Sequence, residues 1–149
     1  MADAATISIT ATMLPDEIAK TITGSMTLAP ADANHKWYYK LTSVTNSSND
    51  MIGGYYSNYT ALADSTAPQT VAVTDTVAFL WIQNTDASND IYVNIAAGTA
   101  AAAAGNITVG AGETWYARLG LTLAGSIHAA TSTGSVTCIV CAMMDDVSV

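Results

Sequence analysis

The segment from Asn84 to Asp90, NTDASND, gathers oxygen-bearing side chains of the kind that bind a hard cation. A calcium loop of the EF-hand type also needs Gly at its sixth position and Glu at its twelfth. Counted from Asn84, these positions hold Asn89 and Ile95, and counted from Asp86 both positions are apolar. The segment is therefore predicted to be a turn, in which Asn and Asp side chains bond to nearby backbone. A looser cation site made by Asp86, Asp90 and backbone carbonyls is the alternative.

Cys138 and Cys141 form a second motif, a cysteine pair with two residues between. Zinc sites and redox pairs both use this spacing, but a structural zinc needs four ligands and the sequence has no second cysteine pair. A redox pair lies at the start of a helix, whereas the surrounding VTCIVCAMM has the composition of a strand. Residues three apart on a strand point to opposite faces, so we predict two free, buried thiols.

Few other residues have types suited to catalysis. His35 lies in a predicted loop and His128 on a predicted strand, and either could meet a Ser or Asp only in the folded chain. Asp145 and Asp146 follow the last predicted strand, a position typical of a solvated acidic tail. No G-x-S-x-G motif and no Gly-rich phosphate loop occurs, and Gly110-Ala-Gly112 has the form of a tight turn. The sequence predicts no catalytic residue, no metal and no cofactor, hence a protein that is not an enzyme.

Composition narrows the classes of partner. The chain has 149 residues, about one domain, and only 11% of them are charged, against the usual ~25%. A surface of small uncharged residues suits permanent packing against other subunits, or an inert coat. The net charge of −8 comes with four cations that do not cluster, which argues against nucleic acid and against an anionic membrane as partners. No secretion signal and no apolar run of ~20 residues is visible, which predicts folding in a cytosol.

Alternation of apolar and polar residues predicts strands along most of the chain. The predicted strands are 6–12, 18–28, 36–44, 55–61, two runs within 70–84, 91–95, 106–109, 113–119, 126–132 and 136–144. In the second run of 70–84, Val77, Phe79 and Trp81 are predicted to face one way and Ala78, Leu80 and Ile82 the other. A strand that is apolar on both faces is typically central in its sheet and covered on both sides.

Short strands at roughly ten-residue spacing, with turn signals between them, predict an all-β fold. The fold class is an antiparallel, jelly-roll-like β-sandwich in a single domain, 1–149. The five alanines from Ala100 to Ala104 are too few to form a helix unaided. Residues 1–30 carry a separate strand pair, which is predicted to be an N-terminal arm that contacts a neighbouring subunit.

Clustered aromatic side chains are the candidate interface, because each ring offers a large contact area at low entropic cost. The candidates are Trp37, Tyr38, Tyr39, Tyr55, Tyr56 and Tyr59. On a strand, Trp37 and Tyr39 share one face while Tyr38 points to the other, so at least one of the three is expected in the core. Core packing, a subunit interface and carbohydrate binding all remain open for this set.

The C-terminal half carries a recurring pattern of strands and turns, from about Val77 to Met144. An apolar strand ends in Asn and a polar loop (FLWIQNTDASNDIYVNI), then a Gly turn and Glu precede an aromatic strand (ITVGAGETWYARL), and two more strands follow (SIHAATSTGSVTCIVCA). This pattern resembles the small jelly-roll virion proteins of tailed bacteriophages, in particular the capsid decoration or cement proteins.

The resemblance implies a non-enzymatic virion protein on the outer capsid surface, made in the host cytoplasm. Such a protein stabilises the shell by bridging major capsid proteins. It typically acts as a homo-oligomer, for which a trimer is favoured. The alternatives are a head-fibre or tail-associated sandwich that contacts host-surface glycans, and a non-viral carbohydrate-binding module, which the lack of a secretion signal disfavours.

Overall fold

The computed structural model describes residues 4–13, 20–30, 35–55, 70–96, 98–101 and 107–145. The chain divides into two compact units, Met1–Ala33 and Asn34–Val149. The boundary lies close to the end predicted for the N-terminal arm, at residue 30. Tyr56, Tyr59 and most of the predicted strand 55–61 lie outside the described residues, as do Ala102–Ala104 and Asp146.

The first unit is a two-stranded antiparallel hairpin made of β1 (Ala5–Met13) and β2 (Lys20–Leu28). The strands pair without interruption, from Ala5 opposite Leu28 to Met13 opposite Lys20. Opposed residues of an antiparallel pair project from the same face, so the period-two pattern of both strands is in register. The prediction of a separate N-terminal strand pair is confirmed.

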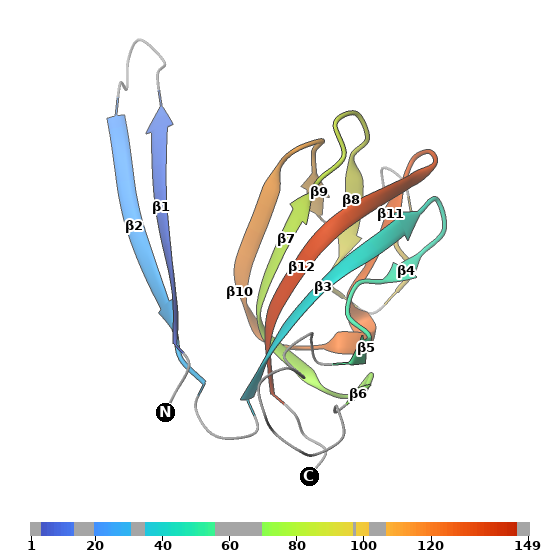
Figure 1. Ribbon diagram of the computed structural model, residues 1–149, viewed down its shortest axis with the longest axis horizontal. Coiled ribbons are helices and arrows are strands. Elements are labelled where there is room, and N and C mark those ends of the chain that lie inside the picture. The colour runs from blue at the N-terminus through green and yellow to red at the C-terminus, as the bar shows by residue number, and fades with distance from the viewer. Residues whose placement is uncertain are drawn as a thin grey trace. The chain divides into compact units, whose positions relative to one another are not determined.

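The second unit contains two four-stranded antiparallel sheets and a short ribbon (Figure 1). The first sheet has the order β10-β7-β12-β3 and consists of β10 (Thr114–Leu123), β7 (Thr76–Asn84), β12 (Ser135–Asp145) and β3 (His35–Thr45). The second has the order β4-β11-β8-β9 and consists of β4 (Asn49–Asp50), β11 (His128–Thr131), β8 (Ile91–Asn94) and β9 (Ile107–Val109). The ribbon pairs β5 (Gly54–Tyr55) with β6 (Thr70–Val71).

The chain path through these sheets is that of a jelly roll. Apart from the β5–β6 ribbon and the β8–β9 pair, successive strands alternate between the two sheets. As a result β3 and β12, the first and last strands of the unit, lie side by side and pair over eleven residues (Figure 1). Two Greek keys that close eight strands into a sandwich define this fold. The predicted all-β, jelly-roll-like sandwich is thus confirmed.

The core lies between the two sheets. It is lined by alternate residues of each strand and contains Tyr38, Val44, Val77, Leu80, Ile82, Ile91, Val93, Val109, Ala129, Val136, Val140, Ala142 and Met144, among others. Every second position of β12, from Val136 to Met144, is buried. Because each buried aliphatic side chain contributes about 1.5–3 kcal/mol, this shared layer stabilises the sandwich.

One detail of β7 differs from the sequence prediction. Val77 was expected on the same face as Phe79 and Trp81, but it lies in the core with Leu80. The reason is a β-bulge: Met143 pairs with Phe79 and Met144 with Val77, which leaves Ala78 without an opposite residue. An extra residue in one strand reverses the alternation beyond it. The predicted central position of β7, between β10 and β12, is confirmed.

Helical structure among the described residues is confined to one 3₁₀ turn, Ala124–Ser126. Ala100 and Ala101, the described part of the alanine run, are not helical. Within the described part of the chain, no helix is long and apolar enough to cross a membrane.

Candidate assembly interface

The NTDASND segment forms a turn held by its own carboxylate. Oδ1 of Asp86 accepts the backbone N–H groups of Ser88 and Asn89, each at 2.8 Å. The backbone N–H of Ser88, followed by that of Asn89, lowers the pKa of Asp86. The turn prediction is confirmed, because the donors that hold this carboxylate are the loop's own amides. Among the described residues, no group of three or more His, Cys, Asp or Glu side chains is placed to hold a metal ion.

Asn84 anchors this turn to the turn between β9 and β10. Its side chain is fully buried, and Nδ2 donates to the carbonyls of Asn89 (2.8 Å), Val109 (3.2 Å) and Gly110 (3.1 Å). Its Oδ1 accepts the backbone N–H of Asp86 at 3.0 Å. One amide therefore satisfies polar backbone in two loops, which explains why an otherwise apolar strand ends in asparagine.

The two cysteines are free and lie on opposite faces of β12, as predicted. Cys138 points into the core, whereas Cys141 lies on the outer face and is half-buried. Burial raises the pKa of Cys138 to about 11, and it raises the pKa of Cys141 as well. Neither thiol has the depressed pKa of a nucleophile or redox sensor.

Alkaline pH is expected to destabilise the fold through Cys138. The unfolded thiol ionises near pH 9, while the folded thiol keeps its proton until about pH 11. The contribution of this neutral, buried thiol is thus fully present below pH 9 and is lost as the pH rises toward 11. Urea denaturation at pH 8 and pH 10.5 should show a larger loss of unfolding free energy for the native protein than for Cys138→Ala. An equal loss in both proteins would contradict this assignment.

His128 meets both a serine and an aspartate in the folded chain. Its Nδ1 lies 3.3 Å from Oγ of Ser48 and 3.2 Å from Oδ1 of Asp50, and its Nε2 lies 3.0 Å from the carbonyl of Gly125. A carbonyl can only accept, so Nε2 carries the hydrogen and donates it. In a hydrolytic triad the serine and the carboxylate contact different ring nitrogens. Here Ser48 and Asp50 both contact Nδ1, an arrangement that differs from a triad. Ser48 Oγ also accepts the backbone N–H of Ala100 at 3.0 Å, so the cluster links separate segments of the chain by hydrogen bonds.

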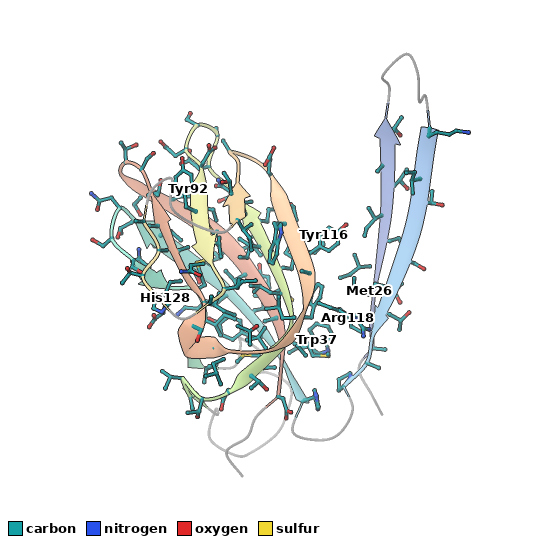
Figure 2. The ribbon with its side chains drawn as sticks, turned by 180° about the vertical axis from the view of Figure 1, so that it is seen from behind. Met26, Trp37, Tyr92, Tyr116, Arg118 and His128 are labelled. Carbon is teal, nitrogen blue, oxygen red and sulfur yellow. The ribbon has the colours of Figure 1, made fainter. Side chains whose placement is uncertain are left out.

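The outer face of the sheet β10-β7-β12-β3 carries a set of large side chains that lie outside the core. Strand register aligns them in three rows, which together we call the assembly face. The rows are Leu41–Ile139–Gln83–Thr114, Tyr39–Cys141–Trp81–Tyr116 and Trp37–Met143–Phe79–Arg118. Residues in one row are cross-strand neighbours, close enough for their side chains to pack together. Trp37, Tyr116 and Arg118 from these rows are labelled in Figure 2, where His128 lies on the other sheet.

The assembly face is apolar and becomes more exposed toward its first row. Phe79 and Met143 are buried, while Tyr39 is 40% and Leu41 60% exposed. In the middle row, the rings of Trp81 and Tyr116 stack with their centroids 5.4 Å apart and their planes 19° apart. Arg118 is the one charged residue in the three rows. A sheet face whose rows consist mainly of aromatic and aliphatic groups is chemically suited to burial against protein.

The aromatic residues singled out from the sequence separate into three groups. Trp37 and Tyr39 lie on the assembly face, as their shared parity predicts. Tyr38 has no exposed surface, and its hydroxyl donates to the carbonyl of Gly53 at 3.1 Å, which places it in the core and away from any partner. Tyr55 contributes backbone to β5, and Tyr56 and Tyr59 lie outside the described residues.

Most of the assembly face was not anticipated from the sequence. Trp81 has no adjacent aromatic residue, and Leu41 and Ile139 carry no ring, so a search for clustered aromatic residues passes over them. Tyr116 follows Trp115 directly, but that pair lies far along the chain from the clusters at 37–39 and 55–59. The available signal was the odd-numbered apolar parity shared by β3, β7 and β12. These odd-numbered residues form one continuous surface only because β3, β12 and β7 are neighbours in the sheet, and the sequence does not give that order.

Comparison of the chain with protein-family models, with curated proteins and with solved structures found no match. The jelly roll is shared by proteins of many unrelated functions, so the fold alone does not decide among them. Among the described residues, the assembly face is therefore the feature that bears most directly on function.

Proposed function

We propose that the protein is a structural, non-enzymatic virion protein that decorates the outer surface of a tailed-phage capsid. It acts as a homo-oligomer and stabilises the shell by bridging major capsid proteins. The observation that carries the proposal is the assembly face, an apolar sheet surface with Leu41 60% exposed in a chain that is only 11% charged. Such a surface suits permanent assembly rather than life as a free monomer.

Three further features support this role. The β-strand pattern from Val77 to Met144 resembles that of decoration proteins, and the chain folds as a jelly roll. The Asp86 turn is short and held by its own hydrogen bonds, which leaves a protease little backbone to attack in that turn. The proposed oligomer presents several copies of each contact with the shell, so weak contacts add through multivalency.

Co-sedimentation with mature, expanded empty capsids of its phage tests the proposal. We expect saturable binding, and capsids that rupture at a higher temperature once the protein is bound. Leu41→Glu places a charge in the exposed row of the assembly face and is expected to weaken capsid binding by on the order of 100-fold, because multivalency is lost. Thr108→Glu, at an exposed position on β9 of the other sheet, is the matched control and should bind like the native protein.

Two results would overturn the decoration role. The first is a folded, oligomeric protein that shows no saturable binding to expanded capsids. The second is binding to host-surface polysaccharide in place of capsids, which would move the protein to a head fibre or tail. Native mass measurement on the same sample shows whether a failure lies in assembly of the protein or in its contact with the shell.

A further inference from the structure

We propose that each copy of the chain lays the apolar face of its β1–β2 hairpin on the assembly face of a second copy. This contact deepens the proposed function, because it names the partner of the assembly face. It rests on the proposed function only for its biological setting. The contact would be sheet on sheet, at the ~10 Å spacing of sandwich layers.

The hairpin has two faces of opposite character. Its uninterrupted register places mainly small and aliphatic residues on one face: Ala5, Ile7, Ile9, Ala11, Ile22, Met26 and Leu28, with Gly24 among them and Lys20 at the end of the face where β2 begins. The other face consists entirely of threonine and serine: Thr6, Ser8, Thr10, Thr12, Thr21, Thr23, Ser25 and Thr27. An isolated two-stranded hairpin is at best marginally stable in water. Its apolar face therefore needs a cover.

Low charge permits the same pairing. The two hairpin strands carry one charged residue, Lys20, at the end of the apolar face, and the assembly face carries one, Arg118. All twelve acidic residues lie outside the two hairpin strands and the three rows, so each apolar surface has little charge to desolvate on contact. Ile22 on the hairpin is 54% exposed, and Leu41 and Tyr39 are exposed on the assembly face, so each surface has apolar area left to bury.

Gly24 gives an independent indication of a close partner. Glycine inside a strand weakens it, and its presence there often marks a place where another backbone or ligand approaches closely. Gly24 is not among the glycines with positive φ, and a Cβ built on it would meet no atom within 4 Å. The chain itself does not require glycine at this position. Because Gly24 has no side chain, it leaves space in the middle of the apolar face, and a ring or aliphatic group from a second copy can fill that space.

The area available fits an exchange in which each copy gives one hairpin and receives one. Each strand of the hairpin has nine residues, so the hairpin is about 30 Å long and about 10 Å wide, and one contact covers roughly 300 Å² on each partner. One contact alone falls short of the ~1,000 Å² expected of a stable interface. Two reciprocal contacts bury about 1,200 Å² in total, which reaches the standard range.

Light scattering on purified protein, without capsids, tests the exchange. The native chain should have a mass that is a multiple of 15.3 kDa. Ile9→Glu and Leu41→Glu should each shift the mass to 15.3 kDa, because each places a charge in the proposed contact. The controls Thr10→Glu, on the polar face of the same hairpin, and Thr108→Glu should keep the native mass. Circular dichroism of each variant verifies that the sandwich is folded.

Mixing the two monomeric variants distinguishes exchange between copies from other uses of the same surfaces. Leu41→Glu retains an intact hairpin and Ile9→Glu retains an intact assembly face, so a 1:1 mixture can form one of the two contacts. Because one contact is weaker than the reciprocal pair, chemical cross-linking at high concentration should yield more dimer in the mixture than in either variant alone. A monomeric native protein, or Ile9→Glu with undiminished mass, would overturn the proposal. So would a mixture that gives no more cross-linked dimer than either variant alone, because the hairpin would then not act on a second copy. A native protein that does not exchange hairpins but binds expanded capsids would refute the exchange and leave the decoration role standing.

Discussion

Asn84→Asp is expected to lower the free energy of unfolding by about 3–5 kcal/mol, although the two side chains have nearly the same size and shape. The asparagine Nδ2 donates to three carbonyls in two loops, and its side chain is fully buried. Aspartate retains the oxygen that accepts the N–H of Asp86, but it replaces the donor with a second acceptor. Either a charge is then buried against three carbonyl oxygens, or the carboxyl is forced to stay protonated.

Asn94→Asp is the matched control for this change. Asn94 is half-buried, and its Oδ1 accepts the backbone N–H of Ala96 at 2.9 Å, the same local bond that Asn84 makes to Asp86. Because its side chain reaches solvent, a charge there should lower the unfolding free energy far less. Urea denaturation of both variants at neutral pH measures the difference. Comparable losses at the two positions would show that Asn84 does not anchor the loops.

Tyr38→Ala is expected to lower the free energy of unfolding by about 3–5 kcal/mol, whereas Tyr39→Ala should change it by less than about 1 kcal/mol. The two tyrosines are neighbours on β3 but point to opposite faces. Tyr38 has no exposed surface, and its hydroxyl both donates to the Gly53 carbonyl (3.1 Å) and accepts the Gly53 N–H (3.3 Å). Tyr39 is 40% exposed on the assembly face.

Assembly should show the reverse order of effects. Tyr39→Ala removes a ring from the middle row of the assembly face and is expected to reduce oligomer mass at low concentration while the fold persists. Thermal denaturation together with light scattering on the two variants separates the two roles. Tyr38→Phe isolates the hydroxyl and should lower the unfolding free energy by about 1 kcal/mol, since only the Gly53 bonds are lost. Equal thermal stability of Tyr38→Ala and Tyr39→Ala would contradict this assignment of faces.

The sequence by itself determined the structural features that depend only on residues close together in the chain. Period-two alternation places side chains on one face or the other of a single strand, so it sufficed to separate Tyr38 from Tyr39 and Cys138 from Cys141. Asx side chains bond to amides two or three residues away, so the Asp86 turn was also predictable. The N-terminal hairpin followed from the same local pattern.

Tertiary structure alone decided which strands are neighbours, and with them the candidate site. The pairing of β12 with both β3 and β7 brings Cys141 between Tyr39 and Trp81, residues far apart in the chain. Strand order depends on how the two sheets share one core, a property that no local pattern encodes. The same holds for the bulge at Ala78, which is set by pairing with β12, and for the meeting of His128 with Ser48. Local alternation determines which face of its strand each side chain occupies, and the packing of the two sheets determines which of those faces lie side by side as one surface.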